Sequence, residues 1–143
     1  MTGIAYRLVS FKSCPWVQRV AIVLREKGLG FDFIHIESDD RPDWFGAVSP
    51  HNKVPVLLID GFAVWDTLAI AEYLAERCPD KQLWPADRRA RARARSVCAE
   101  MHAGFGALRS HFPMNVEARL PEIGAKVLAE QAGVRSDLAR IVQ

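Results

Sequence analysis

The sequence lacks any long hydrophobic run, although half of its 143 residues are hydrophobic. None of its apolar stretches approaches the roughly 20 residues that a membrane-spanning helix requires. The N-terminus also lacks a basic region followed by an apolar run and a small-residue cleavage site, which is the pattern of a secretory signal peptide. We therefore expect a cytoplasmic globular protein of one or two small domains, with no membrane partner.

The chain also has little excess of charge of either sign. Its 19 lysines and arginines against 17 acidic residues leave a formal net charge of +2, which is far less basic than a typical nucleic-acid-binding domain. Five arginines do cluster at positions 88, 89, 91, 93 and 95. Alternate residues of a helix point about 200° apart, so this cluster predicts a solvated helix surface and not one basic stripe. No nucleic-acid partner is expected.

Cysteine is scarce, and the three cysteines, Cys14, Cys78 and Cys98, include no close pair. An odd number without paired spacing argues against a disulfide framework and a zinc pattern, so we expect reduced thiols. Cys98 and His102 are four residues apart on a predicted helix, a spacing that metal ligands use, but no second pair completes a site. The sequence therefore predicts no metal centre.

The first part of the chain alternates strand and helix patterns. It predicts, in order, a strand at 6–10, a helix at 15–27, a strand at 31–37, a short helix at 42–48, strands at 54–60 and 62–65, and a helix that runs to about 77. The strand–helix–strand start is typical of a parallel βαβ unit. Asp60-Gly61 is a tight-turn pair, so the last two strands are expected to be antiparallel. These patterns together predict a mixed α/β sheet.

From about Asp87 onward the composition changes to helix formers and the pattern becomes helical. A long helix ended by Pro113 is predicted, because five apolar residues fall on one face: Val97, Met101, Phe105, Leu108 and Phe112. Two further helices are predicted, one at about 120–131 and one that starts near Ser136 and continues to the last residue, Gln143. This part of the chain is therefore expected to be all-α.

The most informative stretch is Ser10-Phe11-Lys12-Ser13-Cys14-Pro15-Trp16, which places a cysteine where a predicted strand gives way to a helix. The free N–H groups and positive dipole end of a helix stabilise a thiolate, which is the reactive form of cysteine. Pro15 fits the first helical turn. A Cys-x-x-Cys site would have its resolving thiol at Val17, so Cys14 would need an external thiol such as glutathione. The alternative is an inert cysteine that fills space at a helix start.

Three segments carry a family resemblance, in both order and spacing. They are Ser13-Cys14-Pro15-Trp16-Val17-Gln18-Arg19, Ser49-Pro50-His51-Asn52-Lys53-Val54-Pro55-Val56-Leu57 and Trp65-Asp66-Thr67-Leu68-Ala69-Ile70-Ala71-Glu72-Tyr73-Leu74. With these segments the chain resembles the cytosolic glutathione S-transferases. The similarity is closest to the cysteine-type members, which are omega-like or related bacterial transferases, and it covers essentially the whole chain.

The resemblance implies a fold of two domains. Residues 1–79 would form an α/β thioredoxin-like domain that binds glutathione, and residues 87–143 would form an all-α glutathione-transferase C-terminal domain. Transferases of this kind are usually longer, so the helical domain is expected to be incomplete and to expose apolar surface. The chain would then be either a fragment or a naturally shortened member.

The resemblance also implies roles for individual residues. Cys14 would be the catalytic thiol and would form a mixed disulfide with glutathione. Pro55 would be a cis-proline, and the backbone of Val54 would pair with the cysteinyl part of glutathione. Lys53 would bind one carboxylate of the tripeptide, which is an exposed and modest contribution, or would simply be a solvated loop lysine.

Asp66 and Thr67 stand where the family most often has Glu-Ser, which holds the γ-glutamyl end of glutathione. The Asp66 carboxylate would attract the ammonium group, and the Thr67 hydroxyl with the helix N–H groups would receive the carboxylate. A cavity for a second, more apolar substrate would be lined by Trp16, His102, Phe105 and Arg109. Phe105 is equally explained as a core residue, and His102 as a partly buried helix residue.

The expected function is that of an enzyme, a glutathione-dependent transferase whose cysteine favours thiol transfer, deglutathionylation or reduction of small electrophilic or disulfide acceptors. Glutathione would be its substrate or cosubstrate, no metal is expected, and the expected assembly is a homodimer. One alternative is a zeta-like isomerase or dehalogenase that uses glutathione as a true cofactor. Another is a non-catalytic module of the same fold that binds a protein partner.

Overall fold

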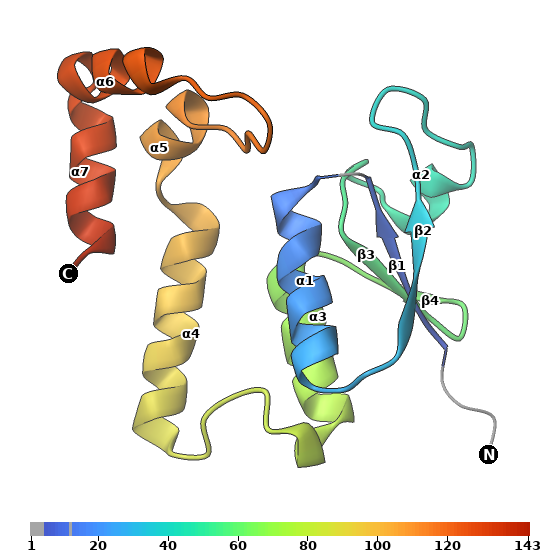
Figure 1. The fold of residues 1–143 in the computed structure, drawn as a ribbon. Helices are drawn as coiled ribbons and strands as arrows, with labels where there is room; N and C mark the ends of the chain where they lie inside the picture. Colours follow the sequence, from blue (N-terminus) through green and yellow to red (C-terminus); the bar gives the residue numbers. More distant parts are fainter. Residues whose placement is uncertain (1–4, 12) are drawn as a thin grey trace. The chain divides into compact units, whose positions relative to one another are not determined.

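The computed structural model describes residues 5–11 and 13–143, which form two compact units (Figure 1). The first unit ends at Arg95 and the second comprises Ser96–Gln143. The boundary falls within helix α4 (Arg88–Ala103). Within the described part of the chain, no helix is long and apolar enough to cross a membrane.

The first unit is built on a four-stranded mixed sheet with the order β2-β1-β3-β4. Its strands are β1 (Tyr6–Ser10), β2 (Phe31–His35), β3 (Val56–Ile59) and β4 (Phe62–Val64). Its helical elements are α1 (Pro15–Glu26), α2 (Phe45–Val48), α3 (Thr67–Arg77) and a 3₁₀ turn, η1 (Pro79–Lys81). β1 and β2 are parallel, whereas the β1–β3 and β3–β4 pairs are antiparallel. The predicted βαβ unit and hairpin are confirmed, although β2 and β3 are shorter than predicted.

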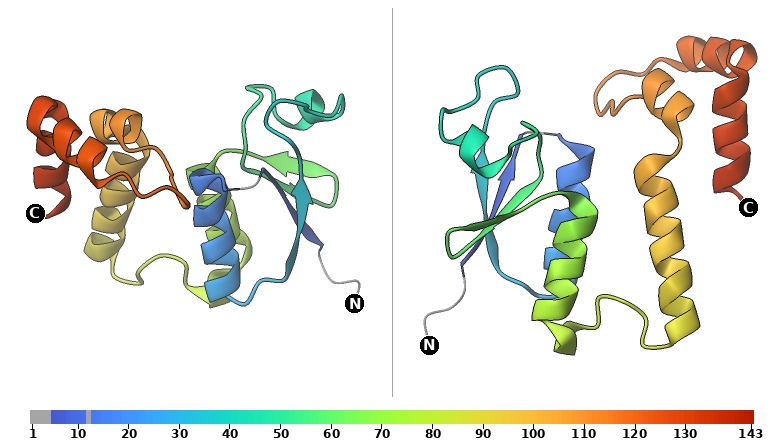
Figure 2. Two further views of the ribbon diagram at one scale, coloured as in Figure 1. Left: turned by 45° about the horizontal axis from the view of Figure 1, so that its top comes forward. Right: turned by 180° about the vertical axis from the view of Figure 1, so that it is seen from behind.

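Helices α1 and α3 pack side by side against one face of this sheet (Figures 1 and 2). The buried face of α1 is the one that the apolar spacing predicts and consists of Val17, Val20, Ala21 and Leu24. α3 contributes Ile70 and Leu74 to the same layer. Complete burial of one Val, Leu or Ile side chain stabilises a fold by about 1.5–3 kcal/mol, so this layer is the main source of stability in the unit.

Two backbone turns fix the ends of these elements. α1 ends at Glu26, and Gly28 follows its C-cap with a φ of +63°, which lies in the left-handed region that favours glycine. The β3–β4 hairpin turns at Asp60 and Gly61, with φ values of +49° and +84°. Two consecutive positive φ angles are what a two-residue type I′ turn requires, which explains why the Asp-Gly pair predicts this hairpin correctly.

The second unit is all-helical, as expected, but the prediction of one long helix through Phe112 is wrong. After α4 it contains α5 (Gly106–His111), α6 (Pro121–Glu130) and α7 (Ala132–Ile141). The break falls at Phe105, which has a left-handed φ of +61°. Gly104 lies so close to the Glu100 carbonyl oxygen that a Cβ would come within 2.8 Å of it. Only glycine fits at position 104, where the chain leaves α4. The spacing of apolar residues carries no information about this steric constraint, so it predicts a continuous helix.

The prediction that the last helix starts near Ser136 and continues to Gln143 is also wrong, since α7 starts at Ala132 and ends at Ile141. α7 packs against α5, where a Cβ on Gly133 would lie 3.0 Å from the Cβ of Ala107. Asp137 accepts a hydrogen bond from the Leu108 N–H at 2.9 Å. These tertiary contacts favour a helix across Gly133, a residue type that by itself weakens a helix prediction.

Candidate active site

Cys14 and the Val54-Pro55 pair lie at the same end of the sheet. β1 and β3 are antiparallel neighbours, with Val9 near the end of β1 opposite Val56 at the start of β3. The segment that follows β1 and carries Cys14 therefore leaves the sheet where the chain enters β3. We call this end of the sheet the site end.

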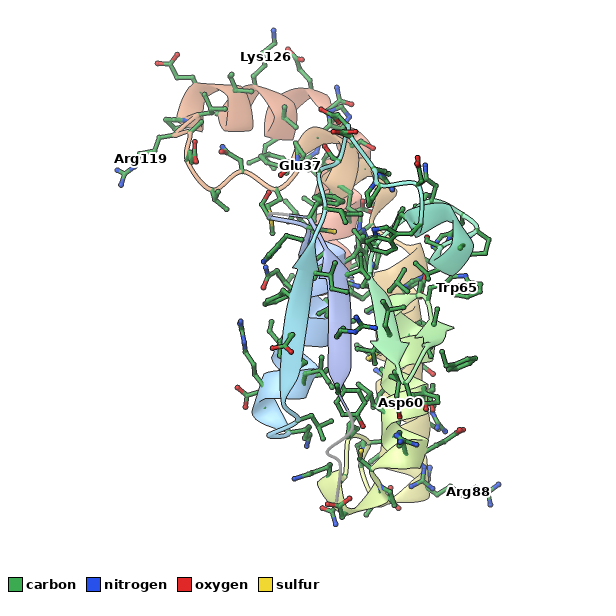
Figure 3. The ribbon with its side chains drawn as sticks, turned by 90° about the vertical axis from the view of Figure 1, so that its right-hand side faces the viewer. Glu37, Asp60, Trp65, Arg88, Arg119 and Lys126 are labelled. Atoms are coloured by element: carbon green, nitrogen blue, oxygen red, sulfur yellow. The ribbon has the colours of Figure 1, made fainter. Side chains whose placement is uncertain are left out.

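The start of α3 lies at the site end as well. β4 is antiparallel to β3, with Leu57 opposite Val64, so β4 ends where β3 begins and Asp66-Thr67 follow directly. Figure 3 shows Trp65 beside α2 and Asp60 at the other end of the hairpin. The topology thus brings together three segments that are far apart in the sequence and that carry the predicted catalytic and glutathione-binding residues.

Cys14 is the N-cap residue of α1 and is only 3% exposed. Its backbone is extended, and its carbonyl accepts the Gln18 N–H at 3.2 Å as the first hydrogen bond of the helix. Pro15 takes the first helical position, as predicted. The N–H groups of a first helical turn have no partner within the helix, and they favour a negative charge beside them. This position is suited to a thiolate nucleophile.

The loop before β3 is held by Ser49, which is completely buried. The Ser49 hydroxyl donates a hydrogen bond to the Lys53 carbonyl at 2.7 Å and accepts one from the Lys53 N–H at 3.0 Å. The peptide bond between Val54 and Pro55 is cis, as predicted. Lys53 is exposed, whereas Val54 and Pro55 are buried. The loop therefore presents an exposed lysine beside a fixed backbone segment.

The sequence pattern alone predicts no role for Ser49. Its only sequence signal is a small polar residue before Pro50, and serine in a polar turn is too common to single out. Its importance comes from a hydrogen-bond pattern that only the folded loop creates.

The start of α3 provides a cap and an unused hydroxyl group. Asp66 is the N-cap residue, and its carboxylate accepts the Leu68 N–H at 3.2 Å. Thr67 is 7% exposed, and its Oγ1 atom is buried with no hydrogen-bond partner among the described residues. Buried hydroxyl groups are rarely left unpaired, because the lost hydration costs about 1–3 kcal/mol. An unpaired donor at a helix N-terminus indicates a position for an anionic ligand group.

The four residues predicted to line a second-substrate cavity are divided between the two units. Trp16 is half-buried in the first unit, where the Arg19 guanidinium lies 4.3 Å from its ring centre. His102, Phe105 and Arg109 belong to the second unit. Arg109 donates hydrogen bonds to the carbonyls of Met101 and His102, so it caps the end of α4. A cavity common to the four residues stays a prediction.

The cysteines and carboxylates give no indication of a metal centre. All three cysteines are free; Cys14 is buried, and Cys78 and Cys98 are partly buried. No group of three or more His, Cys, Asp or Glu side chains suited to a metal ion occurs among residues 5–11 and 13–143.

Comparison with known proteins identifies the family of the first unit. Residues 8–82 match the N-terminal domain of the glutathione S-transferases. Over 82 residues the chain is 37% identical to glutathione S-transferase omega-1 of Rattus norvegicus, a match that covers 57% of the chain and 34% of the rat protein. Over 98 residues it is 32% identical to a probable maleylacetoacetate isomerase of Caenorhabditis elegans, covering 68% of the chain and 46% of that protein.

A solved structure with a similar fold is that of a glutathione S-transferase from Methylobacterium radiotolerans in complex with glutathione sulfonate. The TM-score is 0.68 at 27% sequence identity, and the match covers 96% of this chain and 65% of that chain. The chain thus spans less than half the length of the two curated relatives and about two thirds of the solved one.

Proposed function

Because this chain belongs to the glutathione S-transferase family, we propose that it is a glutathione-dependent thiol transferase with Cys14 as its catalytic thiol. It has the thioredoxin-like domain of that family, followed by helices. The single observation that carries the proposal is a cysteine at the N-cap of α1, at the site end of the sheet, in a chain with omega-class relatives. A serine or tyrosine in this position would instead favour activation of glutathione's own thiol.

The proposed glutathione site uses the three segments at the site end. The backbone of Val54, fixed by the cis peptide bond to Pro55, would pair with the cysteinyl part of glutathione. The exposed Lys53 ammonium would bind the glycine carboxylate, a contact that solvent weakens. Asp66 would bind the γ-glutamyl ammonium, and the Thr67 hydroxyl would bind the γ-glutamyl carboxylate. In these assignments Lys53 and Asp66 each pair with a glutathione group of opposite charge, and the Thr67 hydroxyl pairs with a carboxylate that accepts its hydrogen bond.

The proposed reaction consists of two thiol–disulfide exchanges. In the first, the Cys14 thiolate attacks the glutathionyl sulfur of a mixed disulfide, a Cys14–glutathione disulfide forms, and the acceptor leaves as a thiolate that takes up a proton. In the second, a glutathione thiolate attacks the glutathionyl sulfur bound to Cys14, which releases glutathione disulfide and restores the Cys14 thiolate. Val17 stands where a resolving cysteine would be, so the second step requires this external thiol.

The proposal also covers the second substrate, the cellular location and the oligomeric state. The second substrate would be a small disulfide or electrophile. The protein would act in the cytoplasm as a homodimer, as is common in the family. A sedimentation-velocity experiment at micromolar concentration tests the dimer, since a monomeric sedimentation coefficient over the whole range would contradict it.

The test of the proposal is peptide-mapped mass spectrometry after brief exposure to glutathione disulfide at neutral pH. We expect fast, selective glutathionylation of Cys14, and Cys14→Ser should lose thiol transfer from a glutathionylated substrate. Cys78→Ser and Cys98→Ser are the matched controls and should keep that activity. Equal labelling of all three thiols, or full activity of Cys14→Ser, would show that Cys14 is not the nucleophile.

The match to a probable maleylacetoacetate isomerase supports a second candidate function, a zeta-like isomerase that uses glutathione as a cofactor. The two functions differ in what happens to glutathione. An isomerase converts a cis-enone diacid with catalytic glutathione and leaves the total glutathione thiol unchanged, whereas thiol transfer consumes one glutathione thiol for each glutathione disulfide that it releases. If the chain binds no glutathione even at millimolar concentration, the remaining alternative is a protein-binding module of the same fold.

A further inference from the structure

Ser49 has three polar contacts within the loop that precedes Pro55. Besides its two hydrogen bonds to the backbone of Lys53, its hydroxyl oxygen lies 3.3 Å from Nδ1 of His51. A hydroxyl group has one hydrogen to donate and two lone pairs to accept with. The hydrogen points to the Lys53 carbonyl, so the contact with His51 requires that Nδ1 carries the donated proton.

A ring contact of His51 connects the loop to the start of α3. The His51 ring stacks on the Trp65 ring, with the ring centres 6.1 Å apart and the planes 30° from parallel. Trp65 directly precedes Asp66 and Thr67, the pair at the N-terminus of α3. The buried Ser49 hydroxyl thus holds the Lys53 backbone through two hydrogen bonds. It also contacts His51, whose ring stacks on Trp65 next to the second proposed glutathione-binding segment.

We infer that Ser49 is a positioning residue for glutathione binding, acting through the Lys53 backbone and the His51 ring. This inference rests on the proposed function, because it concerns how the same site holds glutathione. Ser49 is completely buried and touches no ligand itself. Its role is to keep Lys53 and the backbone of Val54 in the geometry that glutathione requires, and to hold that loop in register with Asp66 and Thr67.

Other contacts hold the loop when the Ser49 hydroxyl is removed, so the role is separable from folding. The Asn52 N–H donates to the Ser49 backbone carbonyl at 2.8 Å, a bond that any side chain at position 49 retains. Arg41 donates to the backbone carbonyl of Asn52 and to its Oδ1 atom. Loss of the hydroxyl should therefore loosen the loop without unfolding the unit.

The test compares Ser49→Ala with Ser38→Ala, since the exposed Ser38 hydroxyl donates a hydrogen bond to its neighbour Asp39 at 2.8 Å. Glutathione affinity is measured by isothermal titration calorimetry, and KM and kcat for thiol transfer are measured with saturating acceptor. For Ser49→Ala we expect Kd and KM for glutathione to rise about ten-fold, which corresponds to about 1.4 kcal/mol. We expect kcat to stay within about two-fold, since no group that touches the reacting sulfur changes.

A second variant, His51→Ala, keeps the inference testable if Ser49→Ala folds poorly. His51 is exposed, so its removal spares the core, and we expect a smaller rise in Kd, of about three-fold. Unchanged Kd in folded Ser49→Ala and in His51→Ala would overturn the inference while leaving the proposed function intact, as would a fall in kcat at unchanged KM. A wild-type protein that binds no glutathione would overturn both.

Discussion

At the scale of single residues, the proposed function would have Thr67 serve binding at the expense of stability. Its hydroxyl oxygen is buried at the start of α3 without a partner in the described chain. In the ligand-free fold this atom has lost its water and gained nothing in return, which costs about 1–3 kcal/mol. Such a cost is tolerable where a bound carboxylate supplies the missing partner.

We expect Thr67→Val to separate these two effects. Valine keeps the shape of threonine without the hydroxyl, so the free energy of unfolding should rise by about 1 kcal/mol, while glutathione affinity falls about ten-fold. Urea denaturation and calorimetric titration measure the two quantities, with Thr67→Ser as the control that keeps the hydroxyl. A variant that is less stable and binds glutathione normally would show that the hydroxyl has a structural partner.

Tyr6 makes stability depend on pH at the far end of β1. Its ring is 5% exposed, and its hydroxyl lies 3.6 Å from the Cys78 sulfur. Burial raises the pKa of Tyr6 above its ordinary value of 10.0, and the contact with Cys78 acts in the same direction, while Arg77 opposes them. The folded state therefore keeps the phenol proton to higher pH than the unfolded state does.

From this shift we expect the free energy of unfolding to be independent of Tyr6 titration below pH 10 and to fall as the pH rises above it. Tyr6→Phe should remove part of that fall, because phenylalanine carries no titratable proton. Denaturant unfolding between pH 8 and pH 11, in steps of about half a unit, measures the slope. Tyr73→Phe is the matched control, and an identical slope in wild type and Tyr6→Phe would contradict the assignment.

At the scale of elements, the proposed function would give the N-cap of α3 two roles. The Asp66 carboxylate caps the helix through the Leu68 N–H and would also attract the ammonium group of glutathione. Asparagine caps a helix about as well as aspartate but carries no charge. The two roles are therefore separable by substitution.

We expect Asp66→Asn to keep the wild-type free energy of unfolding within about 0.5 kcal/mol and to weaken glutathione binding about ten-fold. Asp66→Ala should lose both functions, with about 1 kcal/mol of stability lost through the missing cap. Asp87→Ala is the control, because Asp87 caps the start of α4 through the Ala90 N–H at 2.8 Å and should affect stability alone. Equal binding by Asp66→Asn and wild type would exclude the carboxylate from the site.

A helix or strand is predicted correctly where the interactions that form it lie between residues close together in the sequence. Strand β1, helix α1 and the Asp60-Gly61 hairpin depend on interactions between residues that are close together in the sequence. The sequence pattern predicts all three. The break between α4 and α5 depends on how Gly104 meets the Glu100 carbonyl and on a positive φ at Phe105. Apolar spacing continues across that break, so the pattern predicts one helix where the fold has two.

At the scale of the whole molecule, the two units differ in how much they bury. The cluster of buried hydrophobic side chains that forms the core lies entirely between Tyr6 and Leu74, in the first unit. In the described second unit, Val134 is the one hydrophobic side chain that is fully buried. Several large apolar side chains of that unit are exposed, as expected: Phe112, Met114, Val116, Leu120, Ile123, Leu128, Ile141 and Val142.

We expect this difference to appear in native-state amide hydrogen exchange. Amides of β1, β3, α1 and α3 should exchange slowest, through global unfolding, whereas those of α6 and α7 should exchange faster by about two orders of magnitude or more. Mass spectrometry of peptic fragments resolves the two units. Equal protection of α7 and α1 would show that the second unit gains its stability from contacts beyond those described.

By itself, the sequence determined the order of strands and helices in the first unit and the place of Cys14 at the start of a helix, because local spacing, capping and turn chemistry encode them, whereas the cis-proline was implied by the family resemblance. Only the tertiary structure decided which distant groups meet. It brought Cys14, Val54 and Thr67 to one end of the sheet, and it gave Ser49 its hydrogen bonds to Lys53 and Arg109 its place at the end of α4. The physical reason is that such contacts arise from the pairing of strands and helices that no local pattern records.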